Sequence, residues 1–149
     1  MKLKTEQDMA CNDIEVTVKY AKKDRRVRCI IDFLQSIDMQ IKCDKNNAET
    51  MINVSDIYYI ESIDKRIFVY LEKEVYHTEF RLYQLSEELK EFGFVQVSKS
   101  CILNINVLES LKTLFNSRME ATLKNGEKVY INRNYLNDVK KALKGDNEV

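Results

Sequence analysis

Four basic side chains stand at positions from which a folded sheet could present them to a polyanion: Lys65, Arg66, Lys99 and Arg133. Each falls at the end of a predicted strand or the start of a predicted helix, where side chains project beyond a rigid framework. Polar residues accompany them, namely Ser100, Asn132 and Asn134. Arginine and lysine pair with guanine or phosphate, asparagine pairs with adenine, and hydroxyl and amide groups hold phosphate oxygens. These residue types therefore suit the recognition of nucleic acid.

A further basic group surrounds the start of the first predicted helix. Its members are Lys19, Lys22, Lys23, Arg25, Arg26 and Arg28. Such a cluster could contact phosphate, an acidic partner or an anionic membrane, although the pattern favours solvated surface. The whole chain carries 24 basic and 24 acidic residues, and this net charge of zero predicts no polyanion partner. Recognition of DNA would therefore rest on a local cationic face.

The residue types that catalysis requires do not gather in this sequence. It contains no GxGxxG or GxxxxGK(S/T) motif, and its three glycines cannot line a phosphate-binding loop. The one histidine, His77, falls in an alternating strand, where a structural role is expected. Cys11, Cys29, Cys43 and Cys101 are widely spaced without a CxxC pair, which predicts reduced thiols and neither a zinc site nor disulfides. We therefore predict a protein that is not an enzyme and uses no cofactor, metal or small-molecule substrate.

Hydrophobic periodicity predicts a β-α-β extension at the start of the chain. It comprises an alternating strand over 14–20, a helix over 25–37 and a second strand over 39–43. The helix carries one apolar stripe, formed by Val27, Ile30, Ile31 and Leu34. We assign the extension to residues 1–40 and expect it to serve dimerisation or regulation.

Most of the remaining chain predicts strands rich in Ile, Val, Tyr and Phe, over 49–54, 56–62, 66–72, 74–80, 94–98, 101–105 and 107–115. One helix interrupts them over 81–92, with leucines at helical spacing and Gly93 where a helix stop belongs. A hairpin surrounds Asn125-Gly126, a dipeptide that favours a type I′ turn because both of its positions take positive φ. A last helix over 134–145 ends before Gly145, and residues 146–149 should fray. The pattern predicts a mainly β (α+β) domain over 41–145, with small antiparallel sheets and two short helices.

Four segments in this order resemble the LytTR DNA-binding domain of bacterial response regulators. They are YIESIDKRIFVYL (59–71), EFRLYQLSEEL (79–89), FVQVSKSCILNINVLESL (94–111) and LKNGEKVYINRNYLNDVKKAL (123–143). In that family a helix leads to F-x-x-(I/V)-(H/S)-(R/K)-S-x-(L/V/I)-(I/V/L)-N, which matches Phe94 to Asn104 here. An Asn-Gly hairpin then precedes a basic residue that opens the last helix, which matches Asn125 to Arg133. The resemblance covers about residues 41–145, and its specificity lies in the order of the motifs.

The resemblance implies an elongated domain whose interstrand loops place side chains in successive major grooves of double-stranded DNA. Base contacts would come from Lys65 or Arg66, from Lys99 and from Arg133. Phosphate contacts would come from Ser100, Asn132, Asn134 and Tyr135. Asn104 also matches the family pattern, but a turn residue that secures its own backbone is the reading we favour. The expected core is Phe94, Val97, Ile102, Leu103, Leu123 and Ile131.

The sequence departs from the best-known members at two places. The connection from Ser62 to Arg66 is short, so the resemblance leaves open which of Asp64, Lys65 and Arg66 enters a groove. The receiver domain is replaced by the extension. Compact members built this way are often encoded beside a small integral membrane protein that restrains the regulator, and the resemblance implies such a protein as a further partner.

The leading hypothesis is a bacterial sequence-specific transcription regulator that acts as a homodimer on repeated half-sites, because one small domain buries too little surface for tight specific binding. The alternative is a protein-interaction module with a degenerate DNA site, docked to a membrane-bound inhibitor. No segment approaches the ~18–20 consecutive apolar residues of a membrane helix, and the first ten residues are polar, so we expect a cytoplasmic protein.

Overall fold

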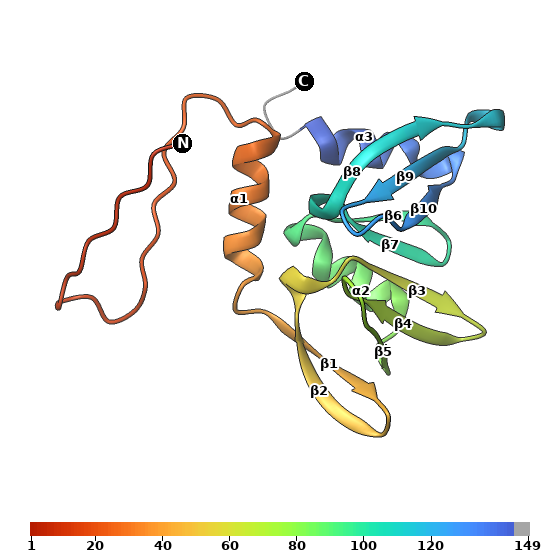
Figure 1. The fold of residues 1–149 in the computed structure, drawn as a ribbon, viewed down its shortest axis with the longest axis horizontal. Coiled ribbons are helices and arrows are strands. Elements are labelled where there is room, and N and C mark those ends of the chain that lie inside the picture. Colours follow the sequence, from red (N-terminus) through yellow and green to blue (C-terminus); the bar gives the residue numbers. More distant parts are fainter. Residues whose placement is uncertain (145–149) are drawn as a thin grey trace.

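The computed structural model describes residues 1–144, so the predicted helix stop at Gly145 and the predicted tail 146–149 lie outside it. Two antiparallel sheets form the body of the molecule (Figure 1). The larger has seven strands in the order β2-β1-β5-β4-β3-β7-β6, and the smaller has three in the order β10-β9-β8. The strands are β1 Gln40–Lys45, β2 Ala48–Asn53, β3 Tyr59–Ile63, β4 Arg66–Tyr70, β5 Val75–Thr78, β6 Phe94–Ser98, β7 Cys101–Asn104, β8 Leu108–Thr113, β9 Met119–Leu123 and β10 Lys128–Ile131.

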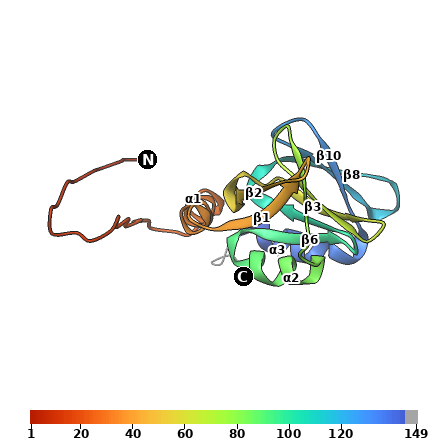
Figure 2. The same ribbon diagram turned by 90° about the horizontal axis from the view of Figure 1, so that it is seen from below.

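Three α-helices and five short 3-10 turns complete the fold. The helices are α1 Arg25–Ser36, α2 Leu82–Leu89 and α3 Leu136–Lys144, and the turns are Val54–Asp56, Lys90–Phe92, Ile105–Val107, Phe115–Ser117 and Arg133–Tyr135. Figure 2 shows α2 and α3 on the same side of the sheets. The mainly β prediction with few short helices is confirmed, and the predicted strand over 94–98 has the bounds of β6.

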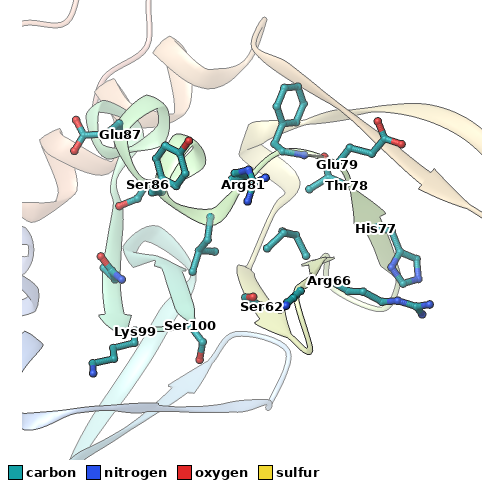
Figure 3. A pocket seen from close by; sticks show the side chains of 16 residues that line it. Ser62, Arg66, His77, Thr78, Glu79, Arg81, Ser86, Glu87, Lys99 and Ser100 are labelled. Carbon is teal, nitrogen blue, oxygen red and sulfur yellow. Dashed lines mark hydrogen bonds between the residues drawn. The ribbon is translucent and has the colours of Figure 1, made fainter.

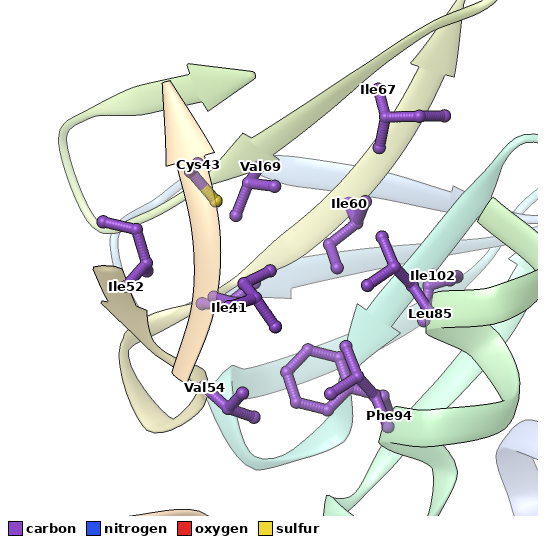
Figure 4. Packing of buried hydrophobic residues seen from close by; sticks show 12 residues of the cluster. Ile41, Cys43, Ile52, Val54, Ile60, Ile67, Val69, Leu85, Phe94 and Ile102 are labelled. Carbon is purple, nitrogen blue, oxygen red and sulfur yellow. The ribbon is translucent and has the colours of Figure 1, made fainter. Parts of the chain in front are cut away.

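Two hydrophobic cores lie under α2 and α3. The first joins α2 to strands β1 to β5, and its side chains include Ile60, Val69 and Leu85 (Figure 4). The second joins α3 to the small sheet and to β6 and β7. The residues predicted as core are all buried, namely Phe94, Val97, Ile102, Leu103, Leu123 and Ile131. Alternating apolar residues therefore located the interior correctly.

The predicted type I′ turn at Asn125-Gly126 is wrong in its geometry. The hairpin between β9 and β10 is present, but only Gly126 of the pair has positive φ (89°). The Gly126 N–H donates to the Leu123 carbonyl (2.8 Å), and the Asn125 Oδ1 accepts from the Glu127 N–H (3.0 Å). This is the pattern of a longer hairpin loop in which a left-handed glycine follows an ordinary turn. The asparagine side chain holds the loop by capping the backbone, which removes the need for positive φ at its own position.

The predicted strand over 14–20 is also absent. Residues 1–24 contain no helix or strand, and Figure 2 shows this segment running away from the body. An alternating sequence forms a strand only when a neighbouring strand satisfies its backbone groups, and no strand of the described chain lies beside it. The second strand of the predicted β-α-β unit does exist as β1, but it pairs with β2 and β5 inside the large sheet.

Candidate nucleic-acid interface

Lys65 lies at the tip of the β3–β4 hairpin in a constrained backbone conformation. Ile63 pairs with Arg66, so Asp64 and Lys65 alone form the connection. Their φ angles are 51° and 68°, which is the pair of left-handed residues that a type I′ turn requires. The turn is compatible with strand twist but disfavours residues that have a Cβ. The Lys65 side chain is thereby held beyond the end of the sheet, with Arg66 beside it as the first residue of β4.

Lys99 and Ser100 form the matching connection between β6 and β7. The Ser98 Oγ accepts a hydrogen bond from the Ser100 N–H (3.2 Å), which closes the turn locally. The Ser100 carbonyl accepts from the Ser62 N–H (2.8 Å), and this backbone hydrogen bond ties the β6–β7 turn to β3 just before the Lys65 turn. The two basic turns are consequently fixed relative to each other by the main chain.

A groove of about 1350 Å³ lies between these turns and the start of α2 (Figure 3). Four of the predicted site residues line it: Lys65, Arg66, Lys99 and Ser100. Asp64 does not, so of the three candidates in this hairpin it is Lys65 and Arg66 that face the groove. The structure therefore brings together residues that lie about thirty positions apart in the sequence.

The charges of this groove are mostly positive and uncompensated. Within residues 1–144, Lys65, Arg66 and Lys99 form no ion pair, and all three are exposed. Two carboxylates also line the groove: Glu87, which pairs with Lys90 at 3.0 Å, and Glu79, which is exposed. The basic side chains of the lining, which include Arg81, outnumber them by four to two. Cations left without partners on a concave surface attract polyanions, even in a protein of zero net charge. The local cationic face that the sequence required is present here.

The segment from Asn132 to Tyr135 lies beside the groove but outside its lining. The Asn132 N–H donates to the Val97 carbonyl (2.9 Å), which anchors the end of β10 to β6 two residues before Lys99. Asn132, Arg133 and Asn134 are exposed, and Arg133 has no ion pair among the described residues. Tyr135 differs from them because it is only partly exposed and packs against the second core.

Asn104 is a structural residue, as we favoured from the sequence. Its side chain is buried, with its amide donating to the Ile57 carbonyl (2.9 Å) and its Oδ1 accepting from the Asn106 N–H (3.0 Å). The second bond secures the following turn, as predicted. The first bond was not anticipated, because it spans from β7 to the loop before β3 and has no signature in local sequence.

Arg81 is a groove residue that the sequence analysis missed. It is exposed, lines the groove and lies directly before α2, where the Gln84 side chain accepts from its backbone N–H (3.0 Å). The criterion that selected Arg133, a basic residue at the start of a helix after a strand, would have selected Arg81 as well. His77 also lines the groove, with its ring 4.6 Å from that of Phe68.

The remaining reactive side chains do not assemble a second site. In the portion that the structure describes, no three His, Cys, Asp or Glu residues lie close enough to hold a metal ion. Cys43 and Cys101 are buried, and burial raises the pKa of the Cys43 thiol to about 11 and that of Cys101 to about 12. Among the described helices, none has the length and apolar composition needed to cross a membrane.

The fold and the groove define a small β-sheet domain with a basic groove on its surface. The solved structure of a LytTr DNA-binding domain from Bacillus cereus superposes with a TM-score of 0.66 at 21% identity, covering 70% of this chain and 95% of that one, which establishes the shared fold. The model of the LytTr DNA-binding domain family matches residues 48–144. The chain belongs to the LytTR family, a family of DNA-binding regulators and not of enzymes.

Curated relatives agree with this assignment. The sensory transduction protein LytT of Bacillus cereus is 33% identical over 94 residues, which are 63% of this chain and 38% of that protein. An uncharacterized HTH-type transcriptional regulator of Staphylococcus aureus is 31% identical over 93 residues, which are 62% of this chain and 63% of that one. The similarity thus spans about two fifths of the Bacillus protein.

Proposed function

We propose that this protein is a sequence-specific transcription regulator that reads the major groove of DNA with loop side chains. The observation that carries the proposal is the grouping of Lys65, Arg66 and Lys99 around one groove, where none of the three forms an ion pair within residues 1–144. A rigid array of free cations at the ends of paired strands matches what DNA recognition requires, since phosphate contacts supply affinity and base edges supply specificity.

The roles follow from side-chain chemistry and position. Lys65 or Arg66, Lys99 and Arg133 contact bases, because they are exposed at turn tips with no competing partner. Ser100, Asn132 and Asn134 contact phosphates, joined by the Tyr135 hydroxyl. Arg81 adds a phosphate contact at the opposite wall of the groove. Two copies bind repeated half-sites, because one domain of this size supports only modest specific affinity. The protein acts in the cytoplasm.

Fluorescence anisotropy with DNA from the protein's own promoter tests this function against shuffled DNA of equal length. Lys99→Ala and Arg133→Ala should each cost about 1–3 kcal/mol on promoter DNA and little on shuffled DNA, as expected for lost base contacts. Lys73→Ala is the matched control, because Lys73 is exposed and lies in the connection at the opposite end of β4 from Lys65. It should leave binding unchanged.

Salt dependence distinguishes this function from the interaction-module alternative. Affinity for DNA should fall steeply with salt, and Arg81→Ala should reduce the slope by about one, the value for one lost phosphate contact. Equal affinity of the wild type for promoter and shuffled DNA, with no loss of affinity in Lys99→Ala or Arg133→Ala, would refute base recognition by these residues.

A further inference from the structure

The connection between β8 and β9 carries a phenylalanine that the fold leaves uncovered. Phe115 is 89% exposed, more than any other large apolar residue from α1 to α3. Within residues 1–144 it belongs to neither hydrophobic core and packs against neither. A single exposed apolar residue is ordinary on a protein surface. Its significance here depends on how the backbone holds it and on what surrounds it.

The backbone around Phe115 forms a closed and constrained tip. The Leu114 N–H donates to the Arg118 carbonyl (2.7 Å), which leaves a three-residue tip that begins with Phe115. The other two residues, Asn116 and Ser117, have positive φ angles of 66° and 63°. Such a conformation costs a residue with a Cβ about 1–2 kcal/mol. Strain of this kind gathers at functional sites, where the surrounding structure holds a side chain in a required position.

Strand register places this tip beside Arg133. Ile131, near the end of β10, pairs with Met119 of β9, so the β8–β9 hairpin continues past β10 by the length of its tip. Neighbouring strands lie ~4.8 Å apart, so a tip centred between β8 and β9 lies roughly 7 Å to the side of β10. Figures 1 and 2 show this tip at the same end of the molecule as the β3–β4 and β6–β7 turns. It therefore continues the edge that carries the proposed DNA contacts.

The charges around the tip are positive. Residues 110–119 contain no carboxylate and two basic residues, Lys112 and Arg118, both of which are exposed. Neither forms an ion pair within the described chain, and the next carboxylate, Glu120, is paired with Lys128 at 2.8 Å. An apolar ring between free cations suits a partner with negative charge outside and flat apolar surface within. A DNA duplex has this structure, with phosphates outside and stacked bases inside.

We propose that Phe115 is a wedge that inserts between two adjacent base pairs of the bound DNA from the minor groove. The inference rests on the proposed function and adds a contact of a different kind to it. A phenyl ring has no hydrogen-bond donor or acceptor with which to read a base edge. Apolar side chains that enter a duplex do so through the minor groove, where they unstack one base step.

Arg118 contacts the phosphates beside this wedge. It opens β9, the strand that lies between β10 and β8, and is therefore placed between Arg133 and Phe115. Its guanidinium carbon lies 5.4 Å from the centroid of the Tyr130 ring, a cation–π contact that holds the side chain on the small sheet. A backbone of phosphates separates a major groove from the adjacent minor groove. Arg133, Arg118 and Phe115 in this order fit major groove, phosphate and minor groove.

The wedge adds specificity at a base step that receives no hydrogen bond. Pyrimidine–purine steps, TA and CA/TG, unstack most easily. An offset of roughly 7 Å corresponds to about two base pairs of 3.4 Å each. We therefore expect such a step about two base pairs from the base that Arg133 contacts.

Promoter DNA with 2-aminopurine in place of single adenines is the probe, because the fluorescence of this base rises when its stacking is lost. The wild type should raise the fluorescence severalfold at one step only. Phe115→Ala should abolish the rise and weaken promoter binding about tenfold, whereas Phe115→Leu keeps an apolar wedge and should retain most of the rise. Phe33→Ala is the matched control, because Phe33 is also more than half exposed (52%) but belongs to α1.

A mismatched base pair at the same step gives a second readout. It removes part of the stacking that the wedge must break, so the wild type should bind the mismatched DNA about tenfold more tightly. Phe115→Ala should show no such gain. Circular dichroism should show this variant folded, because Phe115 contacts neither core. Arg118→Ala should reduce the slope of affinity against salt by about one, as expected for one lost phosphate contact.

The outcomes separate the wedge from the proposed function. If the wild type prefers promoter over shuffled DNA but fluorescence does not rise, or rises equally in Phe115→Ala, the wedge is overturned and the regulator function stands. If the wild type shows no preference for promoter DNA, both are overturned. A membrane surface offers similar chemistry, although one phenylalanine buries little apolar area. Binding to phosphatidylserine vesicles that Phe115→Ala abolishes, without a fluorescence change on DNA, would overturn the wedge and assign the tip to lipid.

Discussion

Replacing Lys65 by glycine should make the protein more stable and less able to bind DNA. Lys65 holds a φ of 68° at the tip of the β3–β4 hairpin, a conformation that costs a residue with a Cβ about 1–2 kcal/mol. Glycine adopts it without that cost, but loses about 0.5–1 kcal/mol more conformational entropy on folding. The difference predicts a net gain of about 0.5–1 kcal/mol, because no hydrogen bond or ion pair of the side chain is lost.

Urea denaturation and thermal melting of wild type and variant measure this gain. The melting temperature should rise by about 2–4 °C per kcal/mol for a chain of this length. Lys99→Gly is the control, because Lys99 occupies the equivalent tip of the β6–β7 turn without positive φ. Glycine there relieves no strain, so that variant should lose stability. Both variants should bind promoter DNA more weakly than wild type.

The sign of the change in the free energy of unfolding of Lys65→Gly decides between the two explanations. If Lys65→Gly is less stable than wild type by the same amount as Lys99→Gly, the left-handed conformation stores no strain and the reasoning from φ is wrong. If stability rises while promoter binding stays unchanged, the strain is real but Lys65 makes no contact with DNA, and Arg66 becomes the residue of this turn that reads the groove.

Three further changes test the framework around the site. Gly93→Ala should destabilise the protein by about 1–3 kcal/mol, because Gly93 has a φ of 90° and a Cβ would lie 2.6 Å from the Asp32 carboxylate. Displacement of Asp32 should also speed amide exchange in α1. Unchanged exchange in α1 would argue against the contact between Asp32 and Gly93. Asn104→Ala should cost about 1–3 kcal/mol in urea denaturation, since it leaves the buried Ile57 carbonyl without its donor. A loss well below 1 kcal/mol would mean that water replaces the amide. Iodoacetamide at pH 8 should label the exposed Cys11 and spare Cys101, whose burial raises its pKa to about 12. Mass spectrometry measures the labelling of each cysteine in the folded protein, and equal rates at the two would contradict the burial of Cys101.

The sequence predicted the strands and the interior because both depend on local alternation. Lys128 to Ile131 alternates between exposed and buried residues, so its apolar residues Val129 and Ile131 face the core. The strand over 14–20 failed for the opposite reason, since alternation does not reveal whether a partner strand exists. The turn chemistry failed in a related way, because left-handed pairs fell at Asn46-Asn47 and at Asp64-Lys65, which both lack the Asn-Gly signature.

The candidate site was predicted by position and not by contact. Basic residues at strand ends were correctly expected to project, and Lys65, Arg66 and Lys99 do so around one groove. Their grouping could not be inferred without the pairing of β3 with β7, which joins residues far apart in the chain. The orientation of α1 was equally hidden, since an apolar stripe predicts a contact surface but not which neighbour it faces. The orientation of α1 is determined by the backbone carbonyls to which Arg25 and Arg28 donate.

The backbone hydrogen bond between Ser62 and Ser100 sets the spacing of the two basic turns without involving the side chains that line the groove. Because both of its atoms belong to the main chain, the spacing between the Lys65 and Lys99 turns is independent of which side chains they carry. Substitutions at these two positions can therefore change the bases that are recognised without changing where on the DNA the turns reach. Regulators of this kind can acquire new operator sequences one residue at a time while the distance between the recognised bases stays constant.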